Sequence, residues 1–160
     1  MHLSEAVVES IISKSYKSSE GKGYNTITLA GGVACNSALR DKLTELGKEN
    51  NIDIEIYLGN EIYFTYDLIE KISELDFYCL NKSKYILIEF PPTNFPLNLC
   101  NIVYELKQKG FIPVLAHVER YIKIHDDPEI IYDCIKTGAI IQINSSSLNW
   151  KTRQRNTKIL

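Results

Sequence analysis

Short apolar or alternating segments, separated by helical patterns, constrain the fold of this chain more than any other feature of its sequence. Their length and their richness in isoleucine and valine indicate strands. The alternation recurs at intervals of roughly 25 residues, which is typical of parallel α/β structure. The expected strands of this half are Asp53–Leu58 (DIEIYL), Tyr85–Phe90 (YILIEF), Phe111–Ala116 (FIPVLA) and Ala139–Asn144 (AIIQIN). YILIEF is of the kind that is buried on both faces.

Helical periodicity fills the intervals between these strands. The expected helices are Tyr66–Leu75, Leu97–Lys109 and Glu129–Lys136. Gly110 and Gly138 follow the last two, as expected at helix ends. Nearer the N-terminus, the pattern predicts a helix over residues 3–17, a strand over Thr26–Ala30 and a helix over residues 38–49. Asn36 or Ser37 can cap that last helix.

Composition excludes several classes of protein. The net charge of −2 and the pI near 5.9 argue against a nucleic-acid-binding surface. No apolar run approaches ~18 residues, so we expect no membrane span, and MHLSEAVVES does not resemble a signal peptide. The four scattered cysteines match neither a zinc site nor a disulfide scaffold. We therefore expect a cytoplasmic protein with reduced thiols.

Three potential metal ligands stand at corresponding positions of successive strand–helix units. Glu61 follows the first strand, Glu89 lies near the end of the second, and His117 follows the third; the two intervals between them are equal. Side chains at the carboxyl ends of parallel barrel strands converge on one mouth. Two carboxylates and an imidazole suit Mn, Fe or Zn.

Other interpretations of these three residues remain open at this point. A carboxylate inside ILIEFP would cost several kcal/mol if it were buried without a partner, but a salt bridge to Arg120 or a lysine would satisfy it. A histidine after an apolar strand is more often structural than a metal ligand. The pattern alone does not decide between these interpretations.

Four segments resemble a known family: YLGNEIY, KYILIEFP, LKQKGFIPVLAHVERY and GAIIQINSSSL. Together they are similar to the bacterial capsule and exopolysaccharide tyrosine-protein phosphatases of the polymerase and histidinol phosphatase (PHP) superfamily, over residues ~51–149. The resemblance implies an α/β fold with a partial PHP-type (β/α) barrel of parallel strands. It also implies metal-assisted hydrolysis of phosphotyrosine proteins, such as a tyrosine kinase of polysaccharide synthesis.

The resemblance also implies roles for individual residues. Glu61 would bridge two Mn²⁺ ions (or Fe, Zn or Mg), and Glu89 and His117 would complete one of them. Arg120 resembles the phosphate-binding arginine of the family, and the planar guanidinium suits phosphate oxygens. The HxH and DxH ligand motifs of the family do not occur here; His2 has no such partner, and His125 lies in a charged loop (KIHDDPE) that leads into a helix.

The N-terminal segment resembles a different family. SEAVVESII and TITLAGGVACNSALRDKL, within residues ~4–48, are similar to the tRNA threonylcarbamoyladenosine synthase component once called O-sialoglycoprotein endopeptidase. The resemblance implies that Gly31, Gly32 and Asn36 lie against a nucleotide, where glycine lets the backbone approach closely and a helix begins. The alternative is an ordinary strand-to-helix turn.

The two resemblances predict a junction near Asn50. We expect residues 1–50 to form an N-terminal βα appendage, residues 51–150 a partial phosphatase domain and residues 151–160 a tail. A gene fusion, a frameshift or an assembly error would each produce this pattern. Three hypotheses follow: a metal-dependent tyrosine phosphatase, an inactive remnant with at most one metal site, and a nucleotide-binding fragment. An open barrel exposes strand edges, so we expect marginal stability or a homo-oligomer.

Overall fold

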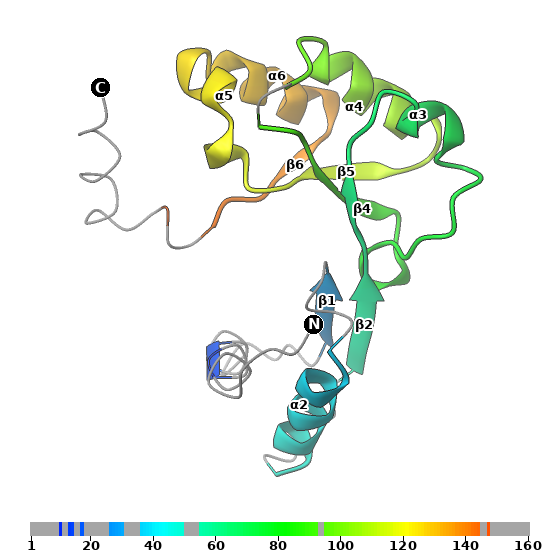
Figure 1. Ribbon diagram of the computed structural model, residues 1–160, viewed down its shortest axis with the longest axis vertical. Helices are drawn as coiled ribbons and strands as arrows, with labels where there is room; N and C mark the ends of the chain where they lie inside the picture. Colours follow the sequence, from blue (N-terminus) through cyan, green and yellow to red (C-terminus); the bar gives the residue numbers. More distant parts are fainter. Residues whose placement is uncertain are drawn as a thin grey trace. The chain divides into compact units, whose positions relative to one another are not determined.

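The chain forms two compact units (Figure 1). The first comprises residues up to Asn60 together with Phe77–Ser83, and the second comprises Glu61–Asp76 and the residues from Lys84 onward. The computed structural model describes residues 10, 13, 14, 17, 26–30, 36–49, 55–92, 95–144 and 147. No helix among these residues is long and apolar enough to cross a bilayer.

The first unit contains a βαβ arrangement. Strand β1 (Thr26–Ala30) pairs in parallel with β2 (Glu55–Gly59), and helix α2 (Ser37–Glu49) connects them in sequence. The predicted strand and helix are thus both confirmed. Leu39 and Leu43, one turn apart on α2, are completely buried, as expected for the apolar stripe of an amphipathic helix. The expected N-terminal helix falls mostly outside the described residues, although residues 10, 13, 14 and 17 are helical.

Strand β2 ends before Asn60, and Asn60 forms hydrogen bonds with a segment that comes later in the sequence. The Asn60 backbone N–H donates to the carbonyl of Tyr78 (2.9 Å), and the Tyr78 N–H donates to the Asn60 side-chain oxygen (2.7 Å). This pair attaches the segment containing the short 3₁₀ helix η2 (Leu80–Lys82) to the end of β2. The predicted strand Asp53–Leu58 is therefore a member of the two-stranded sheet, not of the sheet that contains the later strands.

The second unit is built on a four-stranded parallel sheet in the order β3-β4-β5-β6. Its helices follow the strands in sequence, and α4 and α6 lie side by side on the sheet in Figure 1. Each predicted strand from Tyr85 onward is present, in shortened form. The elements are β3 (Glu61–Tyr63), α3 (Leu68–Lys71), β4 (Tyr85–Glu89), α4 (Leu99–Gln108), β5 (Ile112–Leu115), the 3₁₀ helix η3 (Val118–Arg120), α5 (Ile122–Asp126), α6 (Glu129–Thr137) and β6 (Ile140–Ile141). These described strands form an open sheet and not a closed barrel.

Burial along β4 alternates, which corrects the expectation that both faces of this strand are buried. Ile86 and Ile88 are at most 1% exposed, whereas Leu87 and Glu89, on the other face, are partly exposed. Alternation is the signature of a strand whose two faces meet different surroundings. The hydrophobic core thus contains the buried residues of one face of the sheet. It also contains the buried residues of α4, which are Leu99, Ile102, Val103 and Leu106.

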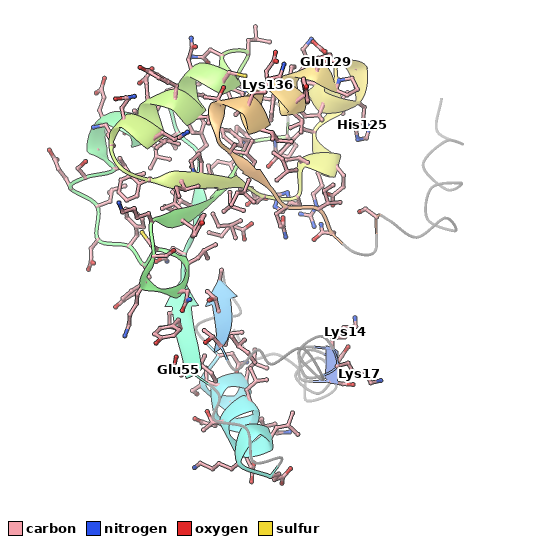
Figure 2. All side chains as sticks on the ribbon, turned by 180° about the vertical axis from the view of Figure 1, so that it is seen from behind. Lys14, Lys17, Glu55, His125, Glu129 and Lys136 are labelled. Carbon is pink, nitrogen blue, oxygen red and sulfur yellow. The ribbon has the colours of Figure 1, made fainter. Side chains whose placement is uncertain are left out.

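Two predicted helical segments differ from the structure. Only Leu68–Lys71 of the expected helix Tyr66–Leu75 is α-helical, and the carboxylates of Glu74 and Asp76 would oppose the dipole of a longer helix at its C-terminal end. His125 belongs to α5 and not to a loop. Helix α6 agrees with its prediction: Figure 2 labels Glu129 in its first turn and Lys136 in its last, a charge arrangement that favours the helix dipole.

Asn36 provides the first test of the fold. Its side-chain oxygen accepts a hydrogen bond from the Leu39 backbone N–H at 3.0 Å, which caps α2. Replacement with alanine leaves that N–H without its acceptor, so we expect Asn36→Ala to destabilise the first unit by about 1 kcal/mol. Denaturant unfolding followed by circular dichroism measures this loss. Asn36→Asp, which keeps the accepting oxygen, is the control; equal stability of the alanine variant and wild type would contradict the cap.

Candidate metal centre

The register of the parallel sheet places two glutamates on one face. Glu61 lies opposite Leu87, and Tyr63 lies opposite Glu89. Because side chains alternate along β4, Leu87 and Glu89 point to the same side of the sheet, and Glu61 shares that side. This is the half-exposed side, where the Glu61 and Glu89 side chains retain 30% and 31% of their exposure. Glu61 opens β3; the sequence had suggested that it follows a strand.

His117 brings an imidazole to the same two carboxylates. Its Nε2 lies 3.0 Å from Glu89 Oε1 and 3.3 Å from Glu61 Oε1. The imidazole side chain is only 9% exposed. One ligand atom from each of the three residues lies within 4.8 Å of the other two. Strands β3 and β4 and the turn after β5 thus converge as the spacing of the sequence predicted, and the resulting donor set, two carboxylates and one imidazole, fits a divalent transition metal.

The turn that contains His117 has an unusual backbone conformation. His117 has φ 33° and ψ 53°. These angles lie in the left-handed region of backbone conformation, which residues other than glycine rarely adopt. Its backbone N–H makes a short hydrogen bond to the side-chain oxygen of Gln142. Nothing in the sequence signals this conformation, because its partner lies on the next strand-forming segment.

An aromatic cluster lies beside the three candidate ligands. Phe90, which follows Glu89 directly, is 1% exposed, and its ring centroid lies 4.9 Å from that of Phe64 and 5.7 Å from that of Phe95. The Tyr121 ring, also 1% exposed, lies 4.8 Å from Phe95 and 6.0 Å from the His117 ring. These contacts give the loops after β4 and β5 a common core.

The pKa of the Tyr121 phenol depends on the charged residues around the site. Burial raises the pKa of the Tyr121 phenol, while the hydrogen bond from Phe90 opposes that shift; the negative charges of Glu89 and Glu61 raise the pKa further, and the positive charge of Arg120 lowers it. The two glutamates and the arginine therefore act on one buried hydroxyl. Arg120 itself is exposed, at the end of η3.

Other residues named from the sequence lie apart from this constellation. His125 is exposed on α5, and its Nε2 lies 2.7 Å from the carbonyl of Glu119. Gly31 and Gly32 lie outside the described residues. Asn36 is described, and its side chain caps α2. Glu61, Glu89 and His117 are the sole grouping of three potential metal ligands within the described part of the chain.

Gln142 and Glu119 were not singled out by the sequence. The Glu119 side chain accepts hydrogen bonds from the side chains of Asn144 (2.8 Å) and Ser147 (3.1 Å). Partial burial tends to raise the Glu119 pKa, but these bonds and those from backbone N–H groups outweigh it, and the net shift is downward. Glu119 thus holds the segment after β6 against the turn that contains His117.

Comparison with known proteins identifies two kinds of relative. A model of the family described as capsular polysaccharide synthesis, CpsB/CapC, matches residues 32–159. Tyrosine-protein phosphatase YwqE of Bacillus subtilis (strain 168) is 35% identical over 115 residues, which cover 70% of this chain and 45% of YwqE. A chain from the crystal structures of B. subtilis YwqE and Streptococcus pneumoniae CpsB, described as metal-dependent tyrosine phosphatases, aligns with a TM-score of 0.64 and 30% identity, over 88% of this chain and 60% of that one.

The second kind of relative is a tRNA N6-adenosine threonylcarbamoyltransferase of Clostridioides difficile (strain 630). It is 57% identical over 51 residues, which cover 32% of this chain and 15% of the transferase. Both resemblances recognised in the sequence are therefore confirmed. The CpsB/CapC match begins at residue 32, inside the segment assigned to the other family, so the junction near Asn50 stays a prediction. This chain spans less than half the length of the curated phosphatases it matches.

Phe90 provides a test of how the site is supported. It is buried and contacts aromatic rings from three other segments. We expect Phe90→Ala to destabilise the second unit by about 3–5 kcal/mol, because it leaves a cavity beside the strand that carries Glu89. Urea unfolding measures the change. Tyr104→Ala, at a side chain that is 57% exposed on α4, should stay within about 0.5 kcal/mol of wild type. Similar losses in the two variants would argue against the aromatic support.

Proposed function

This chain belongs to the CpsB/CapC family of capsular polysaccharide synthesis, and from that premise we propose that it is a metal-dependent phosphomonoesterase acting on phosphotyrosine proteins. The observation that supports this proposal most directly is the convergence of Glu61, Glu89 and His117 within one cluster of ligand atoms. The related solved chain is described as a metal-dependent tyrosine phosphatase.

Glu61, Glu89 and His117 would hold a divalent cation, for which we propose Mn²⁺, with Fe, Zn or Mg as alternatives. When bound, such a cation supplies a Lewis acid and lowers the pKa of water. The chain itself supplies the carboxylates from β3 and β4 and the imidazole Nε2 from the turn after β5. Rigid support matters because catalytic groups displaced by about 1 Å lose much of their effect.

Arg120 would bind the phosphate group of the substrate. It is exposed, it lies three residues after His117, and its charge acts on the same tyrosine hydroxyl as the charges of Glu61 and Glu89. A guanidinium in this position can neutralise charge on the phosphate oxygens during hydrolysis. No cysteine nucleophile is required, and the sequence contains no C-x5-R loop.

We further propose a phosphotyrosine-bearing kinase of polysaccharide synthesis as the substrate and the cytoplasm as the location. The family description supports the link to polysaccharide synthesis, and the names of the related tyrosine-protein phosphatases support a phosphotyrosine substrate. The spacing of the four cysteines, which matches no disulfide scaffold, supports the cytoplasmic location. The HxH and DxH motifs are absent from the chain. For this reason a protein that binds one cation without turnover is a specific second candidate.

One experiment separates these candidates. We expect Mn²⁺-dependent hydrolysis of p-nitrophenyl phosphate, lost on addition of EDTA and reduced on the order of 100-fold in Glu89→Gln and His117→Ala. Glu105→Gln, at an exposed carboxylate on α4, is the matched control. Metal content by mass spectrometry is measured on the same samples. A bound ion without hydrolysis would support the second candidate, and the absence of both would refute the proposal.

A further inference from the structure

Among the described residues, the second ring nitrogen of His117 has no hydrogen-bond partner. This atom, Nδ1, is buried, and no side chain or carbonyl in that part of the protein forms a hydrogen bond with it. In most metal sites a partner on that nitrogen fixes the orientation of the ring. Among the described residues, the orientation of the ring therefore depends on the contacts of Nε2 with the two carboxylates and on the backbone that carries the side chain.

That backbone is itself unfavourable in isolation. A non-glycine residue in the left-handed region is strained and persists only where its surroundings determine the conformation. His117 is such a residue, with φ 33°. The surroundings that hold it are therefore part of the site, although they contain no candidate ligand.

Gln142 holds the turn from the side of β6. Its side-chain oxygen accepts the His117 backbone N–H. Its own N–H donates to the Leu115 carbonyl at 2.9 Å, and its carbonyl accepts from the Val118 N–H at 3.2 Å. One residue thus makes hydrogen bonds two residues before, at and one residue after the left-handed position.

Tyr121 holds the turn from the side of β4. Its hydroxyl accepts a hydrogen bond from the Phe90 N–H at 2.9 Å and donates one to the Ala116 carbonyl at 3.1 Å. Phe90 follows Glu89, and Ala116 precedes His117. The hydroxyl therefore connects the neighbours of two candidate ligands, and the buried ring cannot move without disturbing the aromatic cluster.

We propose that Tyr121 and Gln142 are positioning residues that hold Nε2 of His117 against Glu61 and Glu89 and thereby set the affinity of the site for a cation. The consequence for affinity rests on the proposed function; the orienting role rests on the hydrogen bonds alone. Neither residue needs to touch the cation or the substrate. Their removal should change the site without removing any ligand.

A titration with Co²⁺, followed by its visible absorption, tests the effect on the site. Tyr121→Phe and Gln142→Leu should bind Co²⁺ about 10- to 100-fold more weakly than wild type, with an altered absorption spectrum. Tyr104→Phe, at an exposed tyrosine on α4, should match wild type in both. A purely structural role would lower the melting temperature of the metal-free protein but leave the affinity and the spectrum of the folded variants unchanged. That result would overturn the proposal.

Amide hydrogen exchange of the metal-free protein tests the orienting role independently. Tyr121→Phe should accelerate exchange at Phe90, and Gln142→Leu should accelerate exchange at His117, because each loses its hydrogen-bond partner. If wild type binds no Co²⁺, the proposed function fails, and exchange still decides the orienting role: unchanged rates overturn it. If Gln142→Leu does not fold, Gln142→Asn, whose amide is one methylene shorter, replaces it.

A separate observation concerns two thiols outside this site. Cys100 on α4 and Cys134 on α6 have their Sγ atoms 3.4 Å apart. Cys134 is completely buried, and Cys100 is partly exposed. Burial, followed by the neighbouring Cys100, raises the pKa of the Cys134 thiol. Because Cys100 is the more accessible of the two thiols, an oxidant in solution reaches Cys100 before Cys134.

We infer that these thiols form an oxidation site at which a peroxide installs a disulfide between α4 and α6. The Cys100 sulfur attacks one peroxide oxygen, the O–O bond breaks, and a sulfenic acid and one water form. The Cys134 sulfur then attacks the Cys100 sulfur and the S–O bond breaks; the departing hydroxide takes the Cys134 thiol proton and leaves as a second water. Two thiols are oxidised and one hydrogen peroxide is reduced.

Peptide mass spectrometry without reductant tests this site after treatment with hydrogen peroxide. We expect a linked pair of peptides containing Cys100 and Cys134, a mass lower by two hydrogens, and reversal by dithiothreitol. Cys79→Ser should retain the link, and Cys100→Ser should abolish it. Overoxidation of Cys100 beside an unmodified Cys134, or linkage of either residue to Cys79, would overturn the inference.

Discussion

The parallel register between β3 and β4 is the constraint on which the rest of the second unit depends. It sets Glu61 opposite Leu87 and Tyr63 opposite Glu89, so the two carboxylates point to the same side. A slip of one residue would move Glu61 to the face occupied by Ile86 and Ile88, where an unpaired charge would cost several kcal/mol. The hydrophobic face of β4 therefore enforces the position of the polar site on its other face.

The positions of the candidate ligands could be predicted because they depend on local pattern. The segment YILIEF has the composition of a strand whatever surrounds it, and Glu89 stands at its end. The same is true of His117 after FIPVLA. Parallel strands connected by helices then bring these ends together by topology alone. The half-exposure of Glu89 could not be predicted, because it depends on what covers each face of the sheet.

The features that escaped prediction all involve partners distant in sequence. The hydrogen bonds of Asn60, directly after the end of β2, depend on Tyr78, and no sequence pattern near Asn60 predicts this partner. The left-handed conformation of His117 depends on Gln142, and the bridging hydroxyl of Tyr121 depends on Phe90. Gln142 in particular sits in AIIQIN as an ordinary polar residue of a strand. Its hydrogen bonds appear only once β5 and β6 lie side by side.

The brevity of β3 has a further consequence for how the site behaves in time. This strand has three residues and pairs with a single neighbour, β4, among the described strands. Short edge elements open locally at a lower free energy than central strands, so Glu61 resides on a less stable element than Glu89. A cation held by all three side chains would therefore cross-link an edge strand to the interior of the sheet, and its binding energy would oppose local opening of β3 before it affected global unfolding.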